Sequence, residues 1–203
     1  ATYNDDGYQV QPGSDYTSDG TFCFITGNGY EEGNGGFDDV DGGKTTLFSP
    51  IFNLSSFDDI LISYWYWYTN NIGDNGGNDL WQVMVSNDGG STWNDLQLTS
   101  SSSTEWNKAQ YLLTNYIELT EAIQFKFIAE DLYYDGDGGS GGSLVEAALD
   151  DFNLAYIPTN SGILGDVNND EEINVLDVVL IVNMILGTET TTVAADINLD
   201  GEI

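Results

Sequence analysis

Residues 165–187 read GDVNNDEEINVLDVVLIVNMILG, and in this stretch residue types and spacing together specify a chemistry. Counted from Asp166, oxygen-bearing side chains fall at positions 1, 3, 5, 9 and 12. They are Asp166, Asn168, Asp170, Asn174 and Asp177, and the main-chain carbonyl of Glu172 is free for position 7. A calcium ion takes about six to eight oxygen ligands, and a tight loop that runs into a helix supplies them at this alternation. The pattern therefore predicts a calcium-binding loop.

The loop departs from the usual EF-hand pattern at two positions. Position 12 is Asp177, where an EF-hand has Glu. Position 6, usually Gly, is Glu171, so a residue with a side chain must adopt a turn that favours φ > 0. We also expect Ile173, at position 8, to point inward and seat the loop.

An apolar helix is expected over residues 175–186, with Gly187 as its C-cap. Only Asp177 and Asn183 are polar in this segment. A helix that is apolar on all sides must be covered on several of them. Packing against a second helix of the same module would hide only part of this surface, so the remainder suggests a protein partner.

The same signature recurs thirty residues later, at Asp196, Asn198, Asp200 and Glu202. The two segments, GDVNNDEEINVLD and ADINLDGEI, resemble a type I dockerin. In that family two such units pair with pseudo-two-fold symmetry, each binds one Ca²⁺, and the helices dock onto a cohesin or a neighbouring module. The second loop reaches only position 8, at Ile203, so we expect its remaining ligands beyond this sequence or from another chain. A single Asp-rich segment would indicate only a solvated loop, whereas two copies in register favour calcium.

The composition excludes several classes of function. There are 34 acidic residues against three Lys, with no Arg and no His, and the net charge is −31. Such self-repulsion destabilises a compact fold unless cations bind. The acidic excess argues against nucleic acid and against anionic membrane surfaces as partners. Without His there is no Ser-His-Asp triad and no His-ligated zinc, and no apolar run of about 18 residues exists to span a membrane.

Residues 1–157 show an all-β pattern, with short apolar or alternating runs separated by Gly, Asn and Asp clusters. We expect strands near residues 21–26, 45–49, 60–68, 80–86, 92–98, 108–112, 123–129 and 144–156. Strands of this number and spacing fit a two-sheet β-sandwich. The predicted fold class is mainly β, with a sandwich at 1–157, a linker at 158–162 and the small α-helical dockerin-like module at 163–203.

Several motifs in this region, among them DVDGG, SYWYWYTNN, SNDGGSTW and VEAALDDF, resemble the MAM-like jelly-roll modules that follow the catalytic domains of secreted bacterial metallopeptidases. The resemblance implies a jelly roll, often calcium-stabilised, that serves as an extracellular appendage. It also implies that the first strands precede Ala1. A sandwich that lacks a strand exposes an edge that another chain can fill, so we expect a homo-oligomer or fibre, although truncation of a longer chain explains the same ends.

Three further patterns leave alternatives open. Asp39 and Asp41, together with Asp151, form either a further calcium site on the sandwich or merely a turn and a strand-edge charge. Tyr64, Tyr66 and Tyr68 alternate with two Trp in one strand, so one set is core and the other lies under a loop or stacks on sugar rings. The segment 86–93 matches an Asp-box turn, which is usually structural.

Asn53 begins an Asn-Leu-Ser glycosylation sequon, and residues 188–192 form a Thr-rich tract that suits O-glycans. Taken together, the sequence predicts a secreted or surface-displayed, non-enzymatic protein that is stabilised by Ca²⁺ and works in assembly. The alternative is a carbohydrate-binding appendage of a secreted hydrolase or peptidase.

Overall fold

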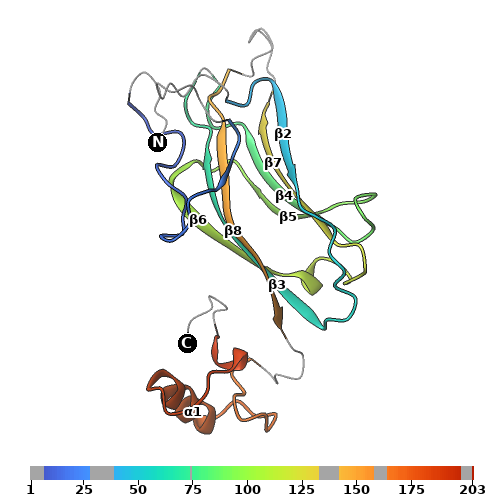
Figure 1. Ribbon diagram of the computed structural model, residues 1–203, viewed down its shortest axis with the longest axis vertical. Coiled ribbons are helices and arrows are strands. Elements are labelled where there is room, and N and C mark those ends of the chain that lie inside the picture. Colours follow the sequence, from blue (N-terminus) through green and yellow to red (C-terminus); the bar gives the residue numbers. More distant parts are fainter. Residues whose placement is uncertain (1–6, 28–38, 74, 133–141, 158–163, 198–202) are drawn as a thin grey trace.

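The computed structural model describes residues 7–27, 39–73, 75–132, 142–157, 164–197 and 203. In these residues eight strands form two four-stranded antiparallel sheets, and one α-helix follows them (Figure 1). The strands are β1 (Phe24–Ile25), β2 (Gly43–Phe48), β3 (Asp59–Thr69), β4 (Leu80–Ser86), β5 (Asn94–Thr99), β6 (Ser103–Leu112), β7 (Gln124–Asp131) and β8 (Glu146–Ile157). The helical segments are η1 (Leu113–Asn115), α1 (Val175–Ile185) and η2 (Val193–Ala195).

The strand order identifies the sandwich as a jelly roll. One sheet has the order β1-β8-β3-β6, and the other has the order β2-β7-β4-β5. This interleaving of early and late strands is that of an eight-stranded jelly roll. The predicted fold class, a mainly β sandwich followed by a helical segment, is confirmed.

The expectation that the first strands precede Ala1 stays a prediction, but the described residues do contain a strand at the edge of this sheet. β1 occupies the edge position beside β8, although only Phe24 and Ile25 pair, with Leu149 and Ala148. A β-bulge follows in β8, where the register shifts and Asp151 has a φ of 49°. Because a bulge disrupts the ladder locally, β1 is shorter than the predicted strand at 21–26.

The core lies between the two sheets and is rich in aromatic rings. Tyr64 and Tyr68 of β3 are 0% exposed. Tyr66, on the same face of β3, stacks on Trp81 of the opposite sheet, with 5.7 Å between the ring centroids. Side chains alternate between the two faces of a strand, so the tyrosines of this segment form the core set.

The tryptophans of β3 lie on the outer face, beneath the N-terminal segment. The Trp67 indole N–H donates a hydrogen bond of 2.8 Å to the Val10 carbonyl. Tyr16 stacks on Trp65, with 3.7 Å between centroids and an interplanar angle of 16°, and the Trp106 ring lies edge-on to Tyr16 at 6.4 Å. The tryptophans of β3 therefore lie under a chain segment, which is the first of the two alternatives that the sequence left open for this strand.

The predicted Asp-box turn joins β4 to β5. The Asp88 carboxylate accepts hydrogen bonds from the Thr92 hydroxyl (2.6 Å), the Thr92 N–H (2.8 Å) and the Ser86 hydroxyl (2.7 Å). Gly90 has a φ of 93°, which suits a residue without Cβ. The Trp93 indole N–H donates to the Gly90 carbonyl at 3.0 Å. These bonds, those from Thr92 first, lower the pKa of Asp88 from 3.8 to about 2.

We expect Asp88→Ala to lower the Tm of the sandwich by about 2–4 °C, because the Thr92 amide loses its acceptor. Since the folded pKa is depressed, this contribution is complete above pH 3.8 and is lost as the pH falls towards 2. Thermal melts of both proteins between pH 2 and 6 measure the difference. Ser91→Ala is the matched control within the turn, and an equal effect of both substitutions would contradict the assignment.

Candidate calcium-binding and docking site

Asp166 opens the first predicted calcium loop and is 1% exposed. Its Oδ1 accepts a hydrogen bond from the Asp170 N–H (3.1 Å), and its Oδ2 accepts one from the Glu171 N–H (2.8 Å). The Asn168 Oδ1 also accepts from the Asp170 N–H at 2.9 Å, and the Asn168 amide donates to Asp170 Oδ2 at 2.8 Å. The structure therefore brings Asp166, Asn168 and Asp170 together around one turn.

Asp177 closes the loop from the first turn of α1 and is also 1% exposed. Its Oδ2 accepts from the Asn174 N–H at 2.9 Å, and its Oδ1 accepts from the N–H groups of Val167 (2.8 Å) and Asn168 (3.1 Å). These bonds, that from Asn174 first, lower the pKa of Asp177 below its usual range. The carboxylate thus stays ionised and ties the start of the loop to the helix.

The two remaining predicted ligands lie between these ends. The Glu172 N–H donates to Asp170 Oδ1 at 2.9 Å, and the Glu172 carbonyl accepts from the Asn174 amide at 3.5 Å. The Asn174 Oδ1 accepts from the Leu176 N–H at 2.8 Å, so Asn174 is the N-cap of α1. All six predicted ligands of the first loop are therefore connected by hydrogen bonds within one short segment.

The donors of this loop are carboxylate, amide and main-chain oxygens, which is the set that a hard cation such as Ca²⁺ prefers. In the part of the chain that the structure describes, no group of three or more Asp, Glu, His or Cys side chains is arranged to hold a metal ion. Binding here would thus need the neutral oxygens of Asn168, Asn174 and Glu172 as well as the carboxylates.

The loop backbone confirms the strain that the sequence indicates at position 6. Glu171 has a φ of 69°, and Asn169 has a φ of 59°. Asn tolerates this left-handed conformation, whereas a Glu there costs about 1–2 kcal/mol. Ile173 differs from the expectation, since it is 60% exposed. The Ile173 side chain lies against Gly165 at the surface and does not point into the core of the module. A Cβ added at Gly165 would be 3.6 Å from its Cδ1 atom.

The second predicted loop begins beside the first. The Gly165 N–H, one residue before Asp166, donates to the Ala194 carbonyl at 2.9 Å. Val167, Met184, Ala194 and Ala195 form one small buried cluster. Asp196 is half-buried, whereas Asn198, Asp200 and Glu202 lie outside the described residues. The entry points of the two loops are therefore adjacent, as the pseudo-symmetric resemblance implies.

α1 (Val175–Ile185) has the predicted position and ends as predicted. Gly187 follows it with a φ of 71°. Its N–H donates to the Met184 carbonyl, and the Thr188 N–H donates to the Asn183 carbonyl, each at 2.9 Å. This pair of bonds is a Schellman motif. None of the helical segments described in the structure has the length and hydropathy of a membrane span.

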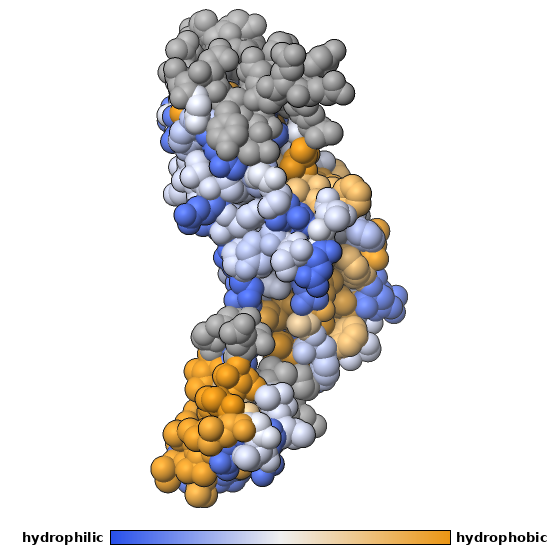
Figure 2. Space-filling model, turned by 60° about the vertical axis from the view of Figure 1, so that its left-hand side comes forward, coloured by the Kyte–Doolittle hydropathy of each residue, from blue (hydrophilic) through white to orange (hydrophobic). Residues whose placement is uncertain are grey.

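The surface of α1 is apolar and open to solvent. Met184 is its one buried apolar residue, and Leu180 and Ile181 pack partly against the small cluster. Figure 2 shows the resulting hydrophobic patch over the C-terminal module. The residues of this docking face are Ile173 (60% exposed), Val175 (68%), Leu176 (57%), Val178 (56%), Val179 (51%), Val182 (47%), Ile185 (60%) and Leu186 (69%).

The structure separates the acids that were expected to form a further site on the sandwich. Asp39 and Asp41 flank Val40, which pairs with Val145. Asp151 lies six residues beyond Val145, or about 20 Å along a strand. Its Oδ1 accepts a hydrogen bond of 2.5 Å from the Thr17 hydroxyl. Asp39 and Asp41 are thus not brought together with Asp151.

Asn53 of the glycosylation sequon is exposed, and its Oδ1 accepts from the Ser55 hydroxyl at 2.8 Å. The residue is accessible, and its glycosylation stays a prediction.

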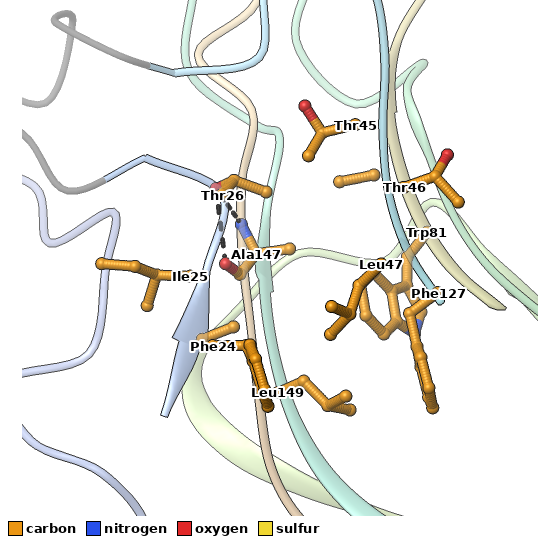
Figure 3. Close-up of a pocket in the computed structure, with 12 residues that line it drawn as sticks. Phe24, Ile25, Thr26, Thr45, Thr46, Leu47, Trp81, Phe127, Ala147 and Leu149 are labelled. Carbon is orange, nitrogen blue, oxygen red and sulfur yellow. Dashed lines mark hydrogen bonds between the residues drawn. The ribbon is translucent and has the colours of Figure 1, made fainter. Parts of the chain in front are cut away.

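A cleft of about 160 Å³ opens between the edges of the two sheets (Figure 3). Phe24 of β1 and the following Thr26 line it from one sheet, and Leu47 of β2, Trp81 of β4 and Phe127 of β7 line it from the other. The Thr26 hydroxyl is already hydrogen-bonded to the main chain of Ala147, as the dashed lines show. The lining is mostly apolar, so this cleft offers little to bind a polar ligand.

Two buried carboxylates were not singled out from the sequence. Asp79 and Asp131 are both 0% exposed. Burial raises the pKa of Asp131 to about 7, and the Gly42 N–H opposes the shift. The charge of Asp79, a hydrogen bond with its side chain and the charge of Asp41 add to it. Each lies at the end of a strand, next to core positions. Among 34 acidic residues this placement is too weak a signal to find them.

Comparison with known proteins agrees with this geometry. Residues 164–203 match the type I dockerin domain. Type I dockerins bind calcium generally, and their partner is a cohesin. No curated protein matches the chain significantly.

Among solved structures, TmCBM61 in complex with β-1,4-galactotriose is 16% identical, with a TM-score of 0.32 over 59% of this chain and 68% of that one. The CBM22-1 xylan-binding domain of Paenibacillus barcinonensis Xyn10C is 10% identical, with a TM-score of 0.38 over 74% and 82% of the two chains.

We expect Glu171→Gly to stabilise the dockerin module by about 0.5–1 kcal/mol. Relief of the left-handed strain outweighs the larger entropy that glycine gives the unfolded chain. Differential scanning calorimetry in excess Ca²⁺ measures the change. Glu172→Gly removes the neighbouring side chain without relieving a positive φ, and should destabilise the module. A stabilising effect of both substitutions would contradict the strain argument.

Proposed function

We propose that the chain is a non-catalytic, extracellular assembly protein whose dockerin module docks onto a cohesin in a calcium-dependent way. The observation that carries the proposal is the docking face of α1, a helix that exposes most of its apolar side chains to solvent. An apolar patch of this kind on a soluble protein marks an interaction site. The match of this segment to the type I dockerin domain supports a cohesin as the partner.

Calcium enters the proposal through the first loop. Asp166, Asn168, Asp170, Asn174, Asp177 and the Glu172 carbonyl would hold the ion, and Asp196 with the rest of the second loop would hold another. The bound ion supplies positive charge that the three Lys residues of the chain do not provide. Because Asp177 belongs both to the loop and to the first turn of α1, ordering of the loop fixes the helix and its docking face.

The jelly roll is the non-catalytic body that docking would bring into an assembly. A carbohydrate ligand for it is the second candidate function. The observation that favours it is the group of Tyr16, Trp65 and Trp106 on the outer face, where Tyr16 is 41% exposed and the Trp rings are half-buried. Aromatic rings of this kind stack on sugar rings.

Self-association into a homo-oligomer or fibre stays a prediction. β1 occupies the edge at which strand exchange was expected, although it pairs with β8 at two residues only, and the dockerin match supports a different partner protein.

We expect Val178→Asp and Val182→Asp each to weaken cohesin binding at least about tenfold, because each places a charge at the centre of the docking face. Isothermal titration calorimetry against a panel of purified cohesin domains, in Ca²⁺ and then in excess chelator, measures the affinity. Chelator and Asp166→Ala should abolish binding, since both leave the loop without its ion.

The matched control for the docking face is Leu98→Asp. It places the same charge at an apolar residue of β5 that is 56% exposed, and it should not affect docking. The control for the loop is Glu189→Ala, which removes an exposed acid outside it. Binding that survives in chelator, or that is indifferent to both valine substitutions, would contradict the proposal.

For the carbohydrate alternative we expect Trp106→Ala to abolish any glycan binding of the wild type, because Trp106 flanks the exposed Tyr16 ring. A glycan array compares the wild type with Trp106→Ala. Tyr156→Ala is the control, because it removes an exposed ring away from this group, on β8. A wild type that binds no glycan would leave the jelly roll without this function.

A further inference from the structure

At the end of the sandwich where β3 and β7 finish and β2 and β4 begin (Figure 1), the chain buries two carboxylates. Asp79 precedes β4, and Asp131 is the last residue of β7. Both are 0% exposed. β4 and β7 are paired neighbours, with Leu80 opposite Glu130, so the two acids lie at adjacent strand ends.

Each carboxylate is anchored by one oxygen and leaves the other unsatisfied. Asp79 Oδ1 accepts a hydrogen bond of 2.7 Å from the Leu132 N–H, and Asp131 Oδ2 accepts one of 3.2 Å from the Gly42 N–H. When both acids are ionised, Asp79 Oδ2 and Asp131 Oδ1 are buried without a hydrogen-bond donor. Leaving a buried charged oxygen unsatisfied is costly, so such a group in a folded protein requires an explanation.

A neutral side chain beside these acids independently leaves a buried oxygen without a partner. Asn70 is 0% exposed, and its Nδ2 donates to the carbonyls of Asp79 (2.9 Å) and Ser100 (3.1 Å). These two bonds fix the orientation of the amide and leave Oδ1 unpaired. The Tyr68 hydroxyl is buried next to this group: after burial itself, the charge of Asp79 is the largest cause that raises its pKa, and the neighbouring Asn70 side chain opposes the shift.

No lysine of the chain neutralises this group. Lys44 is on β2, opposite Glu130, and its Nζ lies 3.6 Å from Glu130 Oε1. Successive residues of a strand face opposite sides of the sheet, so this pair and Asp131 are on different faces. Lys126 lies over the Trp93 ring at 4.2 Å, and Lys108 is in the other sheet, on β6.

We propose that a calcium ion binds at this end of the sandwich between Asp79 and Asp131. Asp79 Oδ2 and Asp131 Oδ1 are its charged ligands, and Asn70 Oδ1 is a neutral one. Anionic and amide oxygens together are the donors that Ca²⁺ takes from proteins. The ion joins the start of β4 to the end of β7, so it stabilises the jelly roll independently of the dockerin loops.

The rival explanation is a proton shared by the two carboxylates. The calcium explanation and the proton explanation predict different effects on stability. A shared proton stabilises the protein without calcium, and replacing one Asp by Asn would imitate the protonated acid. All five Trp residues lie in the sandwich, between Trp65 and Trp106, and residues 164–203 contain no aromatic residue. Tryptophan fluorescence of the full chain therefore reports on unfolding of the jelly roll alone.

The experiment compares thermal melts followed by tryptophan fluorescence in millimolar Ca²⁺ and in excess chelator, with Asp166→Ala as the common background. We expect Ca²⁺ to raise the Tm by about 5–10 °C, as a site at about 100 to 1,000 times its Kd does. Asp131→Asn should remove this rise. Glu130→Gln is the control: it also replaces a carboxylate by an amide, one residue away and on the other face of the sheet. This variant should keep the rise in Tm with Ca²⁺.

A Tm that does not respond to Ca²⁺ would overturn the proposal, and so would a rise that persists in Asp131→Asn. Should that variant fail to fold, Tb³⁺ bound to the background protein provides the second measurement. Excitation of the aromatic rings should give Tb³⁺ emission that Ca²⁺ displaces, because the Tyr68 ring is beside the site. Absence of this emission would equally overturn the proposal.

Discussion

A shortage of positive charge is the constraint on which this structure depends. With three Lys against 34 acidic residues, most buried carboxylates have no cationic side chain to pair with. Main-chain N–H groups take that role. Asp59 accepts from the N–H groups of Ile60 (2.7 Å) and Thr114 (3.2 Å), and Asp166 and Asp177 are held in the same way. A main-chain amide neutralises only part of the charge of a carboxylate, so bound cations would stabilise the fold further.

The two parts of the chain differ in the size of the hydrophobic core that holds them together. The jelly roll has a large core shared by both sheets, whereas the buried cluster of the dockerin module consists of Val167, Met184, Ala194 and Ala195. A core of that size rarely holds a fold by itself, and small domains add metals or partners. We therefore expect the calcium ion and the partner protein of the proposed function to complete the small core that the described residues of this module form.

The parts of the structure that depend on local sequence were predictable. The ligand spacing, the N-cap at Asn174 and the C-cap at Gly187 all lie within one short stretch. Strand register is not local, and this is why Asp39 and Asp151 were grouped although the structure holds them apart. The alternating aromatics of β3 fit either face equally well until the N-terminal segment covers the tryptophans. Burial of Asp79 and Asp131 depends on which strand ends meet, which an acid-rich sequence does not reveal.

The position of β8 has a mechanical consequence for a protein that is attached through its C-terminal module. β8 leads from the sandwich towards that module and lies between β1 and β3 within its sheet. Its ladder with β3 runs from Asp59 opposite Ile157 to Thr69 opposite Glu146. Antiparallel ladder bonds are perpendicular to the strands, so a pull on Ile157 along β8 shears many of them at once instead of opening them one by one. The strand that would carry the load is paired with β3 from end to end, and with β1 at Ala148 and Leu149.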